Sequence, residues 1–224
     1  AALSALTASI AHEVNQPLAG IITNASTCLR MLAATPSDID GAKATARRTL
    51  RDADRASEVI KRLRGLFAGE PMRKDRVDLN EAVREVLSLA AAELQKGRVV
   101  VQTDLNGELP AVFGDRVQLQ QVILNLVLNA CEAMHAVDYG AHRLAIVTSR
   151  EDDEAALAVS DTGIGVPADQ LDQLFRAFYT TKSHGMGIGL FVSRSIVEAH
   201  GGSLVATRNH GAGLTLWVRI PAVN

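Results

Sequence analysis

Apolar residues in the first third of the chain recur with the period of an α-helix. They lie mostly three or four positions apart over residues 3–32, and a second stripe covers residues 39–67. Thr35-Pro36 separates the two stripes, and Ser37 has a side chain suited to capping the second helix. The pattern predicts two long helices joined by a short turn. The two stripes are Leu3, Leu6, Ile10, Val14, Leu18, Ile21, Ala25, Cys28 and Leu32, then Ile39, Ala42, Ala46, Thr49, Ala53, Ala56, Ile60, Leu63 and Phe67.

A single helical hairpin cannot cover both sides of its apolar seam. Two hairpins paired across a two-fold axis bury it as a four-helix bundle. We therefore expect a homodimer through the hairpin. The alternative is a hairpin that packs on the rest of its own chain.

Residues 69–76 (GEPMRKDR) are polar and contain Gly and Pro, which predicts a linker between a domain over residues 1–68 and a second over residues 77–224. The second domain mixes helical and strand patterns without strict alternation. This favours an α+β layer with helices on one face of a mixed sheet. The predicted helices are 79–95, 115–135, 167–175 and 188–200, and the predicted strands are 98–104, 143–150, 155–161, 203–208 and 214–220.

Composition excludes several classes of protein. The net charge is -2 and 47% of residues are apolar, which argues against a nucleic-acid binder and against a disordered chain. Two distant cysteines, Cys28 and Cys131, make no disulfide framework or metal motif. The chain shows neither a signal peptide nor an apolar run of roughly 18 residues, so we expect a cytoplasmic fragment without membrane contact. The helical pattern is already under way at Ala1, as in a fragment of a longer protein.

Two glycine clusters and one helix carry the candidate chemistry of the second domain. The clusters are DTGIGVP (161–167) and GMGIGL (185–190), and the second precedes a predicted helix, where backbone N–H groups can bind an anion. Asn125 and Asn129 lie four apart, on one face of the helix QQVILNLVLNACEAM. They are either satisfied core amides or oxygen ligands for Mg²⁺. Asp161, at a strand end, could accept a hydrogen bond from a base or form an ordinary turn.

These four boxes, in the order Asn helix, DxGxG, FxxF (Phe175 and Phe178) and GxGxGL, resemble the histidine-kinase ATPase domain. Its α/β-sandwich fold is shared with gyrase, Hsp90-type and MutL ATPases. The resemblance implies that ATP and Mg²⁺ bind here, with Asn129 as the Mg²⁺ ligand, Asn125 beside the phosphates and Asp161 as the adenine acceptor. The other residues that it implies for ATP binding are Gly163, Gly165, Lys182, Gly185, Gly187, Gly189, Leu190 and Thr215.

A histidine in the first helix carries the second candidate site. His12 is two residues from Ile10 and from Val14, a rotation of about 200° on a helix, so it points away from the apolar seam. The segment ASIAHEVNQPLAG resembles the histidine box of the dimerisation and phosphotransfer domain of sensor histidine kinases. The resemblance implies that His12 accepts phosphate and that Glu13 orients its imidazole. The HEVNQPL sequence is closest to the subgroup of oxygen-sensing nitrogen-fixation kinases and dicarboxylate sensors.

The resemblance predicts a two-component protein-histidine kinase that phosphorylates His12 and passes the phosphoryl group to an aspartate of a response-regulator receiver domain. Gln16 lies four residues after His12, where many relatives have Thr or Asn to orient water for dephosphorylating the regulator. Gln can also orient water, so phosphatase activity is a further expectation. The alternatives are a clamp ATPase of the gyrase or chaperone type and a pseudokinase scaffold.

Overall fold

The computed structural model describes residues 2–67, 74–137, 140, 142–180 and 187–223, with the side chains of residues 2–15, 55 and 57–67 left out. The chain divides into two compact units, Ala1–Ala68 and Gly69–Asn224. No helix in the described part of the chain combines the length and the apolar character needed to cross a membrane.

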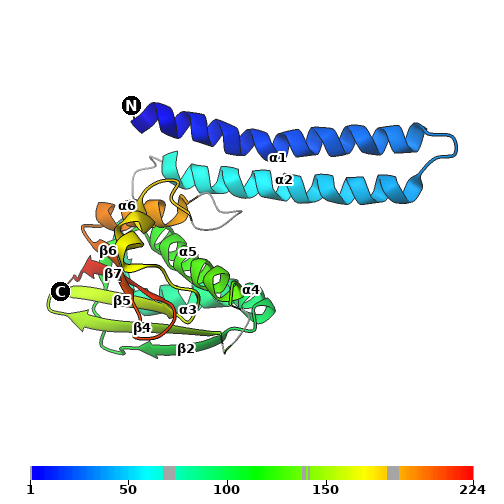
Figure 1. Cartoon of the computed structure of the whole chain (residues 1–224). Coiled ribbons are helices and arrows are strands. Elements are labelled where there is room, and N and C mark those ends of the chain that lie inside the picture. The colour runs from blue at the N-terminus through cyan, green and yellow to red at the C-terminus, as the bar shows by residue number, and fades with distance from the viewer. Residues whose placement is uncertain (1, 68–73, 138–139, 141, 181–186, 224) are drawn as a thin grey trace. The chain divides into compact units, whose positions relative to one another are not determined.

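The first unit is an antiparallel pair of helices, α1 (Ala2–Ala33) and α2 (Ile39–Phe67), as predicted (Figure 1). Helix α1 continues through Pro17. The predicted N-cap of α2 was wrong by one residue: Asp38 Oδ1 accepts a 2.9 Å hydrogen bond from Gly41 N. Ser37 Oγ instead donates to Leu32 O at the end of α1, at 2.8 Å.

Polar contacts cross the seam between α1 and α2. Asn24 Nδ2 donates to Asp52 Oδ2 at 3.0 Å, and Gly20 provides room for this carboxylate, because a Cβ there would lie 2.6 Å from Asp52 Oδ2. Cys28 Sγ lies 3.3 Å from the carbonyl oxygen of Ala42, which is buried. The seam of α2 therefore includes a charged residue, Asp52, that an apolar pattern does not reveal.

The second unit is built on a five-stranded mixed sheet in the order β2-β4-β5-β7-β6. Only β2 and β4 are parallel, and the remaining neighbours are antiparallel. Its strands are β2 (Val100–Leu105), β4 (Arg143–Glu151), β5 (Glu154–Asp161), β6 (Ser203–Arg208) and β7 (Leu214–Pro221). The short strands β1 (Asp75–Val77) and β3 (Val112–Gly114) form a separate antiparallel pair that the apolar pattern did not predict.

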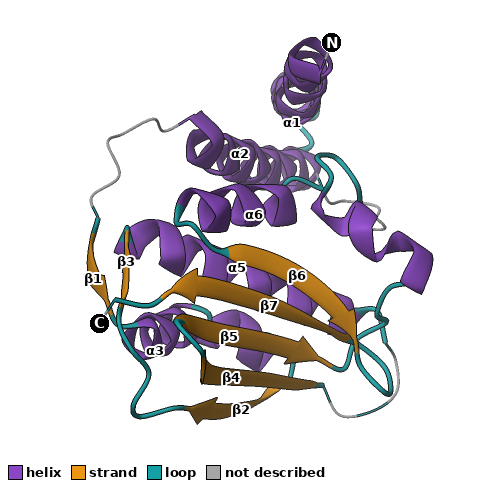
Figure 2. Cartoon of the chain, turned by 90° about the vertical axis from the view of Figure 1, so that its left-hand side faces the viewer, coloured by secondary structure: helices purple, strands orange, loops and turns teal. Residues whose placement is uncertain are grey.

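Helices α5 (Arg116–His135) and α6 (Gly189–Ala199) pack on one face of the sheet (Figure 2). That face carries a row of fully buried side chains, including Ile146, Leu157 and Val218. The opposite face carries Val147 and Val205, which are exposed. This arrangement confirms the predicted fold class, an α/β sandwich with helices on one face of a mixed sheet.

The remaining helices complete the helical layer. The predicted helix over residues 79–95 is divided into α3 (Leu79–Leu89) and α4 (Ala91–Lys96), which meet at Ala90. A 3₁₀ helix, η1 (Ala168–Phe175), follows the first glycine cluster. His200, which is buried, accepts a 2.9 Å hydrogen bond from Asp115 N through Nε2, and its Nδ1 donates to Ile196 O at 2.7 Å. His200 therefore connects the start of α5 to the end of α6.

Candidate ATP-binding and phosphotransfer site

Asn125 lies on the side of α5 that faces the start of α6. Asp115 caps α5 by accepting a 3.1 Å hydrogen bond from Gln118 N, and apolar residues such as Val122 and Leu126 anchor the helix in the core. Asn125 Nδ2 donates to Ser193 Oγ of α6 at 2.9 Å. Asn129 is one turn further along and half-buried. The sequence pattern did not indicate Ser193, because the contact spans 68 positions of the chain.

The start of α6 lies close to the Asn125 side chain of α5. A Cβ on Gly189 would lie 2.5 Å from Asn125 Oδ1. Gly187 has φ +63, and its carbonyl oxygen accepts a 3.1 Å hydrogen bond from Phe178 N. No side chain among the described residues caps the first turn of α6, where the half-buried Leu190 lies. The backbone N–H groups of this turn are therefore suited to an anion.

The Asp161 side chain lies at the end of β5 and is 7% exposed. Its Oδ1 accepts a 2.7 Å hydrogen bond from Gly163 N, which fixes the turn that follows. Gly163 lies against α5, since a Cβ there would be 2.5 Å from the carbonyl carbon of Ala133. Ile164 N donates to Ala133 O at 3.2 Å. The DxGxG segment is thus attached to the helix that carries Asn125 and Asn129.

Thr215 lies beside this site but on the other face of the sheet. It pairs with Ser160 across β5 and β7, and the two hydroxyl oxygens are 2.6 Å apart. Successive side chains of a strand point to opposite faces, so Asp161, the residue after Ser160, projects from the opposite face. Thr215 Oγ1 donates to Asn209 Oδ1 at 2.6 Å. The sequence pattern did not indicate Asn209.

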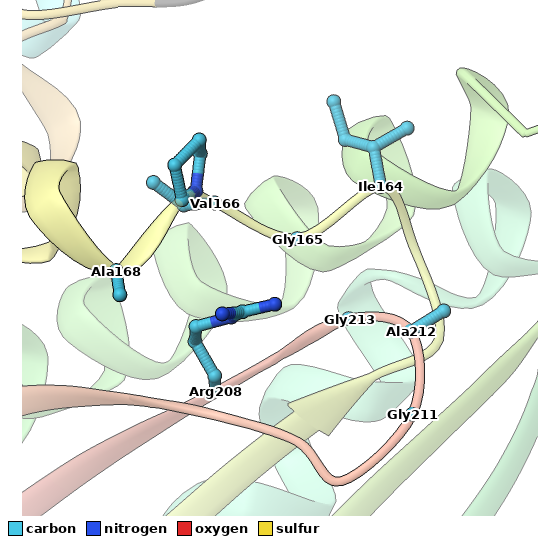
Figure 3. Close-up of a pocket in the computed structure, with 9 residues that line it drawn as sticks. Ile164, Gly165, Val166, Ala168, Arg208, Gly211, Ala212 and Gly213 are labelled. Carbon is cyan, nitrogen blue, oxygen red and sulfur yellow. The ribbon is translucent and has the colours of Figure 1, made fainter.

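A pocket of about 420 Å³ opens between the first glycine cluster and the turn that joins β6 to β7 (Figure 3). Gly165 is the one residue that it shares with the set predicted to bind ATP. Gly165 has φ +64, and a Cβ there would lie 3.1 Å from Gly213 O. The pocket and the predicted phosphate site are therefore separate features. The pocket is lined by Ile164, Gly165, Val166, Pro167, Ala168, Arg208, Gly211, Ala212 and Gly213.

Several predicted site residues lie outside the described part. Lys182 and Gly185 belong to residues 181–186, which the structure does not describe. His12 and Glu13 lie within α1, but their side chains are outside the described residues. Gln16, one turn after His12, is exposed.

In the described residues, no three His, Cys, Asp or Glu side chains gather into a group that could hold a metal ion. A divalent ion at the asparagine helix would therefore need ligands from the nucleotide, as Mg²⁺ commonly has.

Burial raises the pKa of the Cys131 thiol to about 11, with smaller contributions from Glu93 and Glu132. Cys131 thus belongs to the core rather than to a reactive centre.

Two family models match the chain. Residues 2–71 match the His Kinase A (phospho-acceptor) domain, and residues 114–224 match the histidine kinase-, DNA gyrase B-, and HSP90-like ATPase. The sensor histidine kinase TmoS of Ectopseudomonas mendocina is 37% identical over 99% of this chain and 23% of its own length. The sensor protein FixL of Bradyrhizobium diazoefficiens is 37% identical over 100% of this chain and 44% of its own length. The chain thus spans less than half of these relatives.

Solved structures of histidine kinase ThkA have the same folds. Its catalytic domain is 30% identical, with a TM-score of 0.61, over 67% of this chain and 97% of that one. ThkA in complex with the response regulator protein TrrA has a TM-score of 0.75 at 24% identity, over 99% of this chain and 62% of that one. With both domains matched in the predicted order, the chain belongs to the sensor histidine kinases of two-component systems.

Proposed function

We propose that this chain binds Mg-ATP in its second unit and transfers the γ-phosphoryl group to His12 in its first. The observation that carries the proposal is the meeting of Asn125 with Gly189 and Ser193 at the start of α6. An amide-bearing helix and an uncapped helix start lie there in contact. The same chain carries a histidine in a segment matched by the phospho-acceptor family.

The nucleotide is held at two points in this proposal. The Asp161 carboxylate accepts a hydrogen bond from the exocyclic amine of adenine, with Gly163 and Gly165 shaping the turn beside it. The triphosphate lies at the start of α6, where Gly187, Gly189 and the positive end of the helix favour negative charge. In the described residues this turn is supported by the Phe178–Gly187 hydrogen bond. Lys182, Gly185 and Leu190 belong to the same predicted set.

The residues of α5 suit Mg²⁺. Asn129, with Asn125 one turn before it, supplies amide oxygens, which are hard ligands of the kind this ion prefers. When bound, the ion neutralises charge on the phosphates of ATP. The hydrogen bond from Asn125 Nδ2 to Ser193 Oγ holds the amide so that its Oδ1 faces Gly189. A Cβ at Gly189 would crowd this Asn125 oxygen at 2.5 Å.

His12 acts as the nucleophile in the proposed transfer. One nitrogen of the neutral imidazole attacks the γ-phosphorus, the new N–P bond forms, and the P–O bond to the ADP leaving group breaks. Glu13 holds the N–H of the other ring nitrogen, which fixes the tautomer and stabilises the positive charge that develops. Catalysis is otherwise positioning of the γ-phosphate in line with the ring.

The phosphohistidine then passes its phosphoryl group to an aspartate of a response-regulator receiver domain. The ThkA complex with its regulator is the precedent for such a partner. Gln16 is exposed on α1, one turn from His12, where it orients a water molecule for the phosphatase reaction, in which water hydrolyses the regulator's aspartyl phosphate to aspartate and inorganic phosphate. We place this activity in the cytoplasm.

The helical hairpin supports a homodimer. Among the side chains of α1 that the structure describes, four large apolar ones are exposed in the single chain: Leu18 (41%), Ile22 (67%), Leu29 (68%) and Leu32 (45%). They recur at helical spacing along one side of α1, and a second copy of the hairpin can cover them. A four-helix bundle is the arrangement we propose.

The proposed domains are residues 1–68 for dimerisation and phosphotransfer and residues 77–224 for ATP binding. Residues 69–76 form the connection on which the ATP-binding domain moves toward His12. Asp75 and Arg76 pair with β3, so in the described residues the last part of this connection is attached to the second domain.

Incubation with γ-labelled ATP tests the proposal against its alternatives. A kinase gives acid-labile, base-stable label on the protein that is lost in the His12→Gln variant. Release of phosphate without labelled protein indicates a clamp ATPase. ATP binding with neither outcome indicates a scaffold and contradicts the proposal.

A further inference from the structure

A chain of hydrogen bonds runs behind Asp161, from the face of the sheet opposite to its carboxylate. Asn209 Nδ2 donates to the main-chain carbonyl of Asp161 at 2.8 Å. Thr215 Oγ1 lies 2.6 Å from Asn209 Oδ1, and Ser160 Oγ lies 2.6 Å from Thr215 Oγ1. These contacts join β5, β7 and the turn between β6 and β7.

The donor and the acceptor of each of these hydrogen bonds can be assigned. Asn209 Nδ2 faces two carbonyl oxygens, those of Asp161 and Ala212, so the amide nitrogen must be the atom that points there. Asn209 Oδ1 is then an acceptor, and Thr215 must donate its single hydroxyl hydrogen to it. Ser160 must in turn donate to Thr215. Removing the Thr215 hydroxyl therefore leaves Asn209 Oδ1 without this donor.

The carbonyl oxygen of Asp161, which accepts the bond from Asn209, also lies close to Gly213. A Cβ on Gly213 would lie 1.9 Å from Asp161 O, and Gly213 has φ +96, so the turn after Asn209 lies directly against the Asp161 backbone. Asp161 is the last residue of β5, and its carboxylate belongs to the same residue as the clamped carbonyl. Fixing the main chain at this point fixes the direction in which the carboxylate leaves the sheet.

We propose that Asn209 and Thr215 are positioning residues that hold Asp161 for recognition of the adenine amine, and that Thr215 acts through Asn209 rather than on the nucleotide. The inference rests on the proposed role of Asp161. It assigns a function to Asn209, and it places Thr215 among the residues that position Asp161.

The test compares two nucleotides that differ only at the exocyclic amine. Binding of ATP and of purine riboside triphosphate, which lacks that amine, is measured by titration calorimetry on the 224-residue chain. Their ratio of dissociation constants reports the bond to Asp161, whereas general damage to the fold weakens both ligands alike. The variants are Asn209→Ala and Thr215→Val, with Thr215→Ser retaining the hydroxyl and His210→Ala changing an exposed neighbour.

We expect Asn209→Ala and Thr215→Val each to reduce the preference for ATP by about 3- to 10-fold, the value of one hydrogen bond. Thr215→Ser and His210→Ala should retain it. The double variant should lose little more of the preference for ATP than either single variant, because both changes break the same series of hydrogen bonds. An undiminished preference, or fully additive losses, would overturn the inference.

The Asp161→Ala variant separates this inference from the proposed function. A preference that disappears in Asp161→Ala but persists in Asn209→Ala leaves the adenine role of Asp161 standing and overturns the role of Asn209. If the unmodified chain does not prefer ATP, or if Asp161→Ala retains the preference, the adenine role of Asp161 and the role of Asn209 are both overturned.

Discussion

The side-chain amide of Asn125 on α5 donates a 2.9 Å hydrogen bond to the hydroxyl of Ser193 on α6, and this bond connects the two helices of the proposed ATP site. Ser193 is 2% exposed, so its hydroxyl is in a position where water cannot replace it. The bond sets the orientation of the Asn125 amide, and with it the face that Asn125 Oδ1 presents to Gly189.

The Ser193→Ala variant should therefore lose both stability and nucleotide affinity. Loss of the hydrogen bond from the half-buried Asn125 amide costs about 0.5–1.5 kcal/mol of unfolding free energy, measured by urea denaturation. The KM for ATP should rise with it. Ser195→Ala is the matched control, because the exposed Ser195 hydroxyl donates to Phe191 O of its own helix at 3.0 Å. Equal effects of the two variants would contradict this role of Ser193.

Gly163→Ala should displace the DxGxG turn from α5. The added Cβ would lie 2.5 Å from the carbonyl carbon and 2.6 Å from the carbonyl oxygen of Ala133, and helix backbone cannot yield as a flexible side chain does. We expect a loss of about 1–3 kcal/mol of unfolding free energy, together with weaker ATP binding. Gly107→Ala, where nothing lies within 4 Å of the added Cβ, should change ATP binding little. If Gly163→Ala binds ATP normally, the close approach is not required.

The thiol of Cys131 should make stability depend on pH in the alkaline range. Burial raises its pKa to about 11 in the folded chain from an ordinary value of 9.0, so folding favours the protonated thiol. This contribution is fully present below about pH 9 and is lost as the pH rises toward 11. The unfolding free energy of the unmodified chain should therefore fall more steeply between these values than that of Cys131→Ala. Parallel curves for the two proteins would rule out the contribution.

The exposed apolar side of α1 predicts the oligomeric state. Ile22 and Leu29 lie seven residues apart on one side of the helix and are 67% and 68% exposed in the single chain. Replacing both by Asp should convert a dimer into monomers, measured by analytical ultracentrifugation, because charge cannot be buried in the bundle. Thr23→Asp, at a neighbouring exposed position, should remain dimeric. A dimer that survives the double replacement must use another surface.

Much of the fold could be predicted because apolar periodicity records which side of each element is buried. The stripe over residues 3–32 became α1 (Ala2–Ala33), and Asp115 caps α5 where the predicted helix begins. The break at Ala90 and the pair of β1 with β3 were not predicted, since three-residue strands carry too little pattern. Local spacing could also not distinguish Ser37 from Asp38 as the cap of α2.

The candidate site was predictable only where residues are close in sequence. The pairs Asn125 with Asn129 and Gly163 with Gly165 are visible as motifs. Ser193 and Asn209 are not, because their partners lie 68 and 48 positions away. Long-range polar contacts of this kind depend on strand register and helix packing, which no short window of sequence contains.

The most direct test of the proposed kinase activity is to locate the phosphoryl group by peptide mapping under alkaline conditions, after incubating the chain with Mg-ATP. The predicted result is phosphohistidine at His12, absent without Mg²⁺ and absent in His12→Gln. Phosphate on another residue, or unlabelled peptide at His12 while ATP is hydrolysed, would contradict the account.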